Sequence, residues 1–177
     1  MSVAANRYAR ALIDVLPPAK AEEGYEQLVN LNQLLDKEVE ARKLFENPTV
    51  PVDRRKLLLK EIADGLGFST HIRNFVNLLI ERNRLPLLDE IIRAYQKFLD
   101  ERLGIVRASV TAALPLDDGQ RRELTAKLEK ATGKRVRMEV SVDRNLLGGV
   151  VARVGSTIYD GTLLQQLKAV RERLVEE

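Results

Sequence analysis

The stretch IVRASVTAA, residues 105–113, decides the fold, because the hydrophobic period of the chain changes there. Its even-numbered residues from Val106 to Ala112 are apolar, whereas Arg107, Ser109 and Thr111 between them are polar. A period of two over this length is typical of a strand with one buried face. Gly104 directly precedes the stretch, and glycine is the residue that most often follows a helix end. We therefore expect a border near Gly104, with helices before it and a mixed structure after it.

The residues before this border predict a series of helices with short connections. Ser2 and Ser69 stand where helix caps are expected, and Pro51 and Pro86 stand in first turns, where proline is tolerated. Pro17 follows the first apolar pattern and ends it. The pattern gives five or six helices, and helices this closely connected must pack as a compact bundle.

The segment after Pro51 combines apolar and basic residues. Its apolar residues recur at helical spacing and are expected to face the core: Leu57, Leu58, Ile62 and Leu66. Arg54, Arg55 and Lys56 form a basic cluster in the first turn, beside acidic residues. Such a cluster is expected to lie on a solvated face.

One helix and a second strand follow the stretch at 105–113. Asp117 and Gln120 match a capping box, and Gly133 stands where that helix ends. Residues 135–142 alternate again, which predicts a strand. The residues expected to face inward are Val136, Met138, Val140 and Val142.

Two further strands and a last helix complete the chain. Residues 150–154 and 157–160 flank Gly155 and Ser156, as strands flank a tight hairpin turn. Thr162 is expected to cap a final helix, whose apolar stripe is Leu163, Leu167, Val170 and Leu174. The chain is therefore predicted to be α+β, with a six-helix bundle over residues 1–104 and a β-α-β-β-β-α module over residues 105–177.

The composition excludes most site chemistry. The chain has no Cys and a single His, His71, so a thiol nucleophile, a disulfide and a clustered histidine site are absent. No phosphate-binding glycine motif is present, and Gly148 and Gly149 are interpreted as a bulge or tight turn rather than an anion site. No apolar run is long enough to span a membrane. We expect no catalytic residue, no cofactor and no metal site.

The net charge of +3 lies entirely in the second part of the chain. Residues 1–104 hold 16 basic and 16 acidic side chains, and residues 105–177 hold 13 and 10. This excess is too small for a nucleic-acid arm, but it favours an acidic partner for the second part. A basic adaptor that binds RNA or ribosomes is the alternative, based on the basic pI and on Arg135 and Arg137. An enzyme is a third alternative, and the sequence offers the least support for it.

Two predicted helices carry more apolar surface than a single buried stripe requires. In the first helix, one row is Ala5, Ala9, Leu12 and Leu16, and a second row is Ala4, Tyr8, Ala11 and Val15. The helix after Ser69 is similar. Either both helices are central in the bundle, or one row of each faces outward and forms a groove for a partner helix. The pattern alone does not decide between these two interpretations.

The residues resemble those of the ATP synthase delta subunit family, whose mitochondrial counterpart is the oligomycin-sensitivity-conferring protein. The opening ANRYARAL, residues 5–12, is similar to the first motif of that family, and residues 74–85 are similar to its fifth helix and following turn. The most specific similarity is the spaced pattern DRNLLGGV at 143–150, followed by Gly155 and by residues 160–162. The resemblance covers essentially the whole chain.

This resemblance implies a non-catalytic connector of the stator, which holds the catalytic head against rotor torque. It implies that the bundle binds the N-terminal helix of an alpha subunit, and that the second module binds the C-termini of the b subunits. No nucleic acid and no second copy of the chain are expected as partners. The expected location is the cytoplasmic face of the bacterial inner membrane, peripherally, within the ATP synthase complex.

The resemblance also assigns residues. The side chains expected to contact the alpha subunit are Tyr8, Ala11, Val15, Phe75, Leu78 and Leu79. The residues expected to hold the fold of the second module are Gly148, Gly149, Gly155, Asp160, Gly161 and Thr162.

Overall fold

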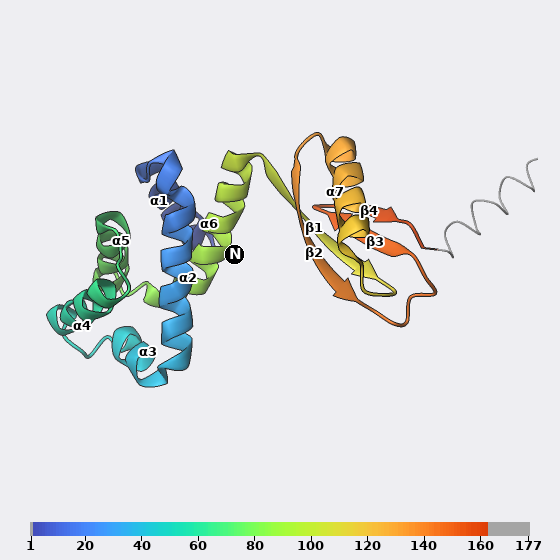
Figure 1. The fold of residues 1–177 in the computed structure, drawn as a ribbon. Coiled ribbons are helices and arrows are strands. Elements are labelled where there is room, and N and C mark those ends of the chain that lie inside the picture. The colour runs from blue at the N-terminus through green and yellow to red at the C-terminus, as the bar shows by residue number, and fades with distance from the viewer. Residues whose placement is uncertain (1, 163–177) are drawn as a thin grey trace, which may run out of the picture. The chain divides into compact units, whose positions relative to one another are not determined.

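The structure is a computed structural model of the 177-residue chain, and it describes residues 2–162 (Figure 1). The chain divides into two compact units, Met1–Leu99 and Asp100–Glu177. The division falls a little before the border expected at residue 104.

The first unit contains six α-helices, which account for most of its described residues (Figure 1). Short 3-10 turns at Pro18–Lys20 and Leu85–Leu87 precede the second and sixth helices. The helices are α1 (Val3–Val15), α2 (Ala21–Lys37), α3 (Val39–Glu46), α4 (Val52–Gly65), α5 (Thr70–Glu81) and α6 (Leu88–Leu103).

The caps of α1 and α5 form as the sequence predicts. The hydroxyl of Ser2 accepts a hydrogen bond from the amide of Ala5, and the hydroxyl of Ser69 accepts one from the amide of Ile72. Each cap satisfies an amide that the first helical turn leaves without a partner. Pro51 lies one residue before the first residue of α4, in extended conformation.

The helices of the first unit enclose one hydrophobic core, to which all six contribute. Tyr95 of α6 is fully buried in it, and its hydroxyl donates to the carbonyl of Ala21 at 2.9 Å. Its ring stacks on that of Tyr25, with 6.3 Å between centroids. A buried tyrosine is stable only where its hydroxyl has such a partner.

Helix α4 differs from the sequence prediction in which face it buries. Leu59 and Ala63 are buried, whereas Leu57 and Leu66 are exposed. The solvated face predicted for the basic cluster is also wrong for Arg55, whose exposed fraction is 2%. Its guanidinium donates to the carbonyl of Phe45 at 3.2 Å and to the side-chain oxygen of Asn83 at 3.0 Å. A charged side chain is found this deep only where it is hydrogen-bonded.

The second unit contains a four-stranded sheet and one described helix, α7 (Asp118–Thr132). The strands are β1 (Ile105–Ala112), β2 (Arg135–Val142), β3 (Val150–Val154) and β4 (Thr157–Asp160), in the spatial order β2-β1-β3-β4. β1 and β2 are parallel and are connected through α7, and the other neighbours are antiparallel (Figure 1). The predicted capping box of Asp117 and Gln120 is present.

One face of this sheet packs on α7. Ala108, Val110, Ala152 and Val154 are buried with Leu128 of the helix. Val142 is exposed, which corrects the prediction that it faces inward: it is the last residue of β2 and is not among the residues that pack on the core of the unit. The α+β class is confirmed by seven helices and a four-stranded sheet in residues 2–162. The final helix expected after Thr162 lies outside the described residues.

Candidate functional site

An apolar groove lies on the surface of the helical unit, between α1 and α5. Its volume is about 260 Å³. Four side chains of α1 and four of α5 line it: Tyr8, Ala11, Leu12, Val15, His71, Asn74, Phe75 and Leu78. Large apolar side chains on a surface commonly mark a binding site for another molecule.

The two apolar rows of α1 have different surroundings. Ala5, Ala9, Leu12 and Leu16 are all buried in the core. Ala11 and Val15 of the other row are exposed, with 66% of Val15 accessible, and Tyr8 is half-buried. The burial of the first row holds the helix in place, and three residues of the second row, Tyr8, Ala11 and Val15, line the groove, whereas Ala4 does not.

Helix α5 forms the opposite wall. Phe75 is largely buried but its ring still lines the groove, next to Leu78, of which 39% is exposed. Leu79 is fully buried, at 0%, and does not line the groove, so the expectation that it contacts a partner is not supported by its position. The physical reason is that consecutive residues point about 100° apart around a helix, so Leu78 and Leu79 face different sides.

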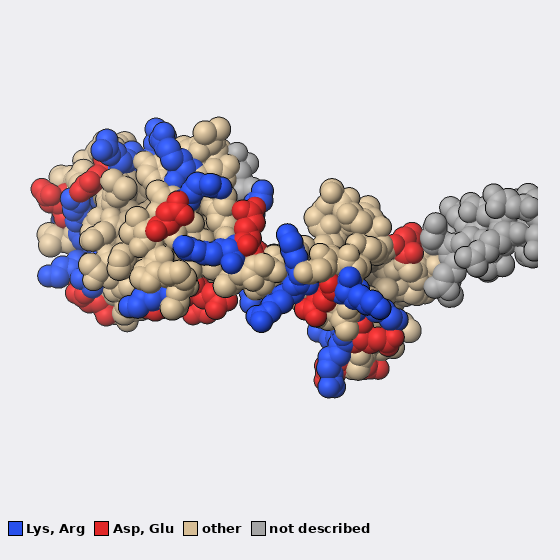
Figure 2. All heavy atoms as spheres, turned by 90° about the horizontal axis from the view of Figure 1, so that it is seen from above, with Lys and Arg blue, Asp and Glu red and all other residues tan. Residues whose placement is uncertain are grey.

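The polar side chains that line the groove are an amide, an imidazole and a phenol. Asn74 and His71 lie on α5 and are exposed, and the sequence analysis did not assign either of them to the site. Among residues 2–162, no Lys, Arg, Asp or Glu lines the groove. Elsewhere on this unit both signs of charge are interspersed, as the face in Figure 2 shows. The groove therefore suits an apolar helix face rather than a charged ligand.

Helix α5 is held at both of its ends. At the start, the amide of Ser69 donates to the side-chain oxygen of Gln27 on α2, at 2.9 Å. At the end, Asn83 accepts from the buried Arg55, and Glu81 pairs with Lys56. That pairing lowers the pKa of Glu81 from its ordinary value, because the hydrogen bond and positive charge of Lys56 favour the carboxylate. These anchors fix the groove wall in the absence of any ligand.

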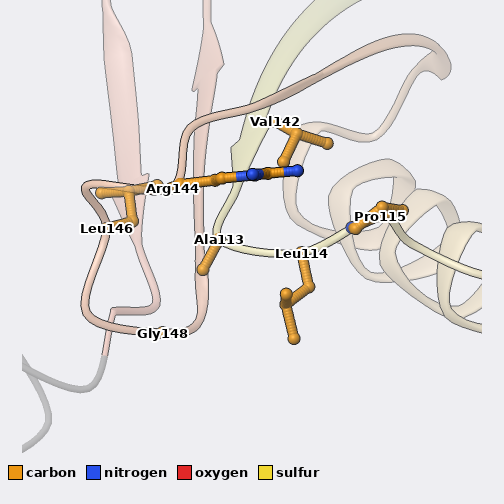
Figure 3. Close-up of a pocket in the computed structure, with 7 residues that line it drawn as sticks. All are labelled: Ala113, Leu114, Pro115, Val142, Arg144, Leu146 and Gly148. Atoms are coloured by element: carbon orange, nitrogen blue, oxygen red, sulfur yellow. The ribbon is translucent and has the colours of Figure 1, made fainter.

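A second hollow, of about 780 Å³, lies at one end of the sheet in the other unit (Figure 3). It is formed where the parallel strands β1 and β2 end and continue into loops. Its lining residues are Ala113, Leu114, Pro115, Val142, Arg144, Leu146 and Gly148. In Figure 3 the side chain of Arg144 extends across Ala113, with its guanidinium beside Val142.

The loops around this hollow are fixed by backbone hydrogen bonds. The amide of Asp143 donates to the carbonyl of Ala112 at 2.9 Å, and the amide of Ala113 donates to Gly149 at 3.2 Å. A side-chain oxygen of Asp143 also accepts from the amide and side chain of Asn145, both at 2.9 Å, which closes a tight turn.

The glycines of the 143–162 pattern lie where a side chain does not fit. Gly149 has φ of 81°, and a Cβ there would meet the carbonyl of Gly161 and lie 2.8 Å from the Cα of Thr162. Gly155, with φ of 61°, lies in the turn between β3 and β4. Gly148 also has positive φ and lines the hollow.

The last residues of the pattern hold the end of β4 in place. The amide of Gly161 donates to the carbonyl of Val150 at 2.9 Å. A side-chain oxygen of Asp160 accepts from the amide of Thr162, also at 2.9 Å. We propose that this set of residues stabilises the unit's fold.

The described residues meet neither the requirements of a clustered metal site nor those of a membrane-spanning helix. Between residues 2 and 162, no three His, Asp or Glu side chains are placed so that they hold a metal ion. Nor does any helix in this range have the length and hydropathy needed to cross a membrane.

The chain matches known proteins over nearly its whole length. The family model described as ATP synthase delta (OSCP) subunit matches residues 4–174. A protein named ATP synthase subunit delta from Geotalea uraniireducens (strain Rf4) is 35% identical over 175 residues, covering 96% of this chain and 95% of its own. One of the same name from Chlorobium phaeobacteroides (strain DSM 266 / SMG 266 / 2430) is 36% identical over 182 residues, covering 99% and 97%.

A solved structure has the same fold. A chain of the Toxoplasma gondii mitochondrial ATP synthase hexamer superposes with a TM-score of 0.65 and covers 99% of this chain and 98% of its own. Its sequence identity is 23%, so the likeness shows the fold alone.

Fold, sequence and relatives together define a non-catalytic structural subunit of a larger assembly. The chain belongs to the ATP synthase delta (OSCP) subunit family. The family predicted from the sequence motifs is therefore confirmed. The alternative, a basic adaptor that binds RNA or ribosomes, is not supported by any of these relatives.

Proposed function

We propose that this chain connects the catalytic head of a rotary ATP synthase to the peripheral stalk. In this proposal the helical unit, as the six-helix bundle of the family, binds the N-terminal helix of an alpha subunit. The second unit binds the C-termini of the b subunits. The protein performs no chemistry but prevents the head from turning with the rotor, and it lies at the cytoplasmic face of the inner membrane.

The observation that carries this proposal is the apolar groove between α1 and α5. Helix-in-groove recognition needs a hydrophobic trough with room for the partner's side chains. The exposed Ala11 presents only a methyl group, so a partner helix reaches the wall closely there, while Val15 and Leu78 contribute larger apolar surfaces on either side.

The rigidity of the groove matters for its affinity. A connector under torque needs a long-lived joint, and nanomolar affinity corresponds to about 12 kcal/mol. Binding that must first order the protein loses part of its interaction energy. The anchors at Ser69 and Asn83 order α5 beforehand, which supports a tight joint.

The function is tested by measuring how well ATP hydrolysis drives ion pumping in membrane vesicles that contain the assembled ATP synthase. The Ala11→Asp variant places a charge in the apolar groove, so we expect the head to hydrolyse ATP while ATP-driven ion pumping decreases at least about tenfold. A torque connector alone predicts this separation, because hydrolysis needs the head but pumping needs the head held still.

The matched control is Leu57→Asp, which places the same charge on an exposed position of α4 outside the groove. Its pumping is expected to equal that of the unsubstituted protein. Equal pumping in the Ala11→Asp and Leu57→Asp vesicles would show that the groove has no role in the connection.

A further inference from the structure

The hollow at the end of the sheet is a surface that the proposed function does not yet use. Building on that function, we propose that this hollow receives the C-terminal end of a b subunit, as a segment with large apolar side chains and an adjacent carboxylate. The proposal places the stalk joint at the ends of β1 and β2, in the loops at 113–115 and 142–148.

The apolar character of the hollow supports a protein partner. Leu114 is 74% exposed although leucine is among the residues most often buried, and Val142 and Leu146 line the same hollow. None of these side chains belongs to the core of the second unit. An apolar segment that filled the hollow would remove them from water together, as the centre of a protein interface does.

The hollow is also largely formed before any partner binds. Backbone hydrogen bonds join Asp143 to Ala112 and Ala113 to Gly149, so both loops are tied to the ends of the strands. A segment that enters between them does not have to order them, which keeps the cost of binding low.

The positive charge of Arg144 favours a binding segment that carries a carboxylate. Among the described residues that line the hollow, Arg144 is the only charged one, and within residues 2–162 no carboxylate pairs with it. The adjacent Asp143 is engaged with Asn145. An incoming carboxylate would therefore meet a cation for which no acid of residues 2–162 competes, at the edge of an apolar surface. The basic excess of residues 105–177 acts in the same direction.

The same charge disfavours a second copy of this chain as the occupant. A symmetric pair of copies joined through this surface places each hollow against its equivalent. Each copy would then bring an Arg144 to the shared surface, and among the described lining residues no acid would offset the two positive charges, which opposes association.

The test measures binding of a synthetic peptide with the C-terminal sequence of the b subunit from the same operon, by calorimetry on the full chain. We expect Leu114→Asp and Arg144→Glu each to weaken binding about tenfold or more. A peptide in which the acidic residue nearest its apolar end is changed to Lys is expected to bind Arg144→Glu better than it binds the unsubstituted chain, because the pair is then restored with reversed signs.

Two matched variants control for general effects of charge. Leu147→Asp changes a side chain that is 77% exposed in the same loop but does not line the hollow. Arg153→Glu reverses an exposed charge on β3, away from the hollow. Both are expected to bind the peptide within about twofold of the unsubstituted chain.

Each other outcome overturns the inference in a recognisable way. If the peptide binds but Leu114→Asp and Arg144→Glu have no more effect than the controls, the hollow is not the site, although the connector function stands. If the unsubstituted chain does not bind the peptide, the stalk part of the proposed function fails with it. A dimer of the chain that Leu114→Asp dissociates, seen by sedimentation, would show that a second copy occupies the hollow.

Discussion

The ring of Tyr8 on α1 meets the ring of Phe75 on α5 edge to face, with 6.4 Å between centroids and 73° between planes. Aromatic pairs prefer this geometry, which contributes about 0.5–1.5 kcal/mol beyond burial of their area. Both rings also line the groove, so the pair joins α1 to α5 within the groove wall itself.

Substitutions of the neighbouring residues Leu78 and Leu79 of α5 are expected to change the free energy of unfolding by different amounts. Leu79→Ala removes a fully buried side chain and should lower the free energy of unfolding by about 2–5 kcal/mol. Leu78→Ala, at a partly exposed groove position, should change it by less than about 0.5 kcal/mol. Urea unfolding followed by far-ultraviolet circular dichroism reports mainly on the helical unit. Equal losses in the two variants would contradict the assignment of Leu78 to the groove.

The buried Arg55 is expected to stabilise the helical unit through neutral partners. Arg55→Ala leaves the carbonyl of Phe45 and the side chain of Asn83 without their donor and opens a cavity, so we expect a loss of about 2–4 kcal/mol. Arg54→Ala, its exposed neighbour, should cost less than about 0.5 kcal/mol. The same unfolding measurement compares them. Similar stabilities would show that the buried hydrogen bonds are not important.

Two glycines offer opposite predictions for the same substitution. Gly149→Ala forces a Cβ against the backbone of residues 161 and 162 at positive φ, and should destabilise the second unit by at least about 2 kcal/mol. Gly65 is the last residue of α4, and a Cβ added there would have no neighbouring atom within 4 Å. Gly65→Ala should therefore stabilise the helical unit by about 0.4–1 kcal/mol.

Amide hydrogen exchange distinguishes these two glycine variants. The amides of Ala113 and Gly161, which bond to Gly149 and Val150, should lose protection only in Gly149→Ala. Retained protection of both amides in Gly149→Ala would show that the backbone adjusts to the added methyl group.

The salt concentration is expected to affect binding of the alpha-subunit peptide and binding of the b-subunit peptide differently. None of the described residues that line the groove is charged, so the affinity for an alpha-subunit peptide should stay constant or rise between about 50 and 500 mM salt. Residues 105–177 carry the whole net positive charge, so the affinity of this part of the chain for the b-subunit peptide should fall over the same range. Calorimetry with each peptide measures both trends. A b-subunit affinity that does not change with salt would remove the electrostatic part of this account.

Features set by local periodicity could be predicted from the sequence. The two rows of α1 follow from the helical repeat, and the caps at Ser2, Ser69 and Asp117 follow from residue type and spacing. The sequence did not show which of Leu78 and Leu79 is buried and which is exposed, because α5 is apolar on more than one side. Periodicity alone does not determine which of two adjacent leucines faces the core.

Features that depend on distant parts of the chain were not predictable. The acceptors of Arg55 lie 10 and 28 positions away, so nothing in its own segment marks it as buried. The hollow at Leu114 and Arg144 forms only because parallel pairing of β1 with β2 brings two separate loops together. An apolar pair at Leu146 and Leu147 in a loop was the one local sign of it.

The central claim is that the groove between α1 and α5 binds a helix of the catalytic head. It is tested most directly by titrating the full chain with a peptide of the alpha-subunit N-terminus, using calorimetry and following backbone amide signals. We predict tight binding, with signal changes concentrated at Tyr8–Val15 and His71–Leu78, and at least tenfold weaker binding by Ala11→Asp but not by Leu57→Asp. Binding that leaves these two segments unchanged, or that Ala11→Asp does not weaken, would contradict the account.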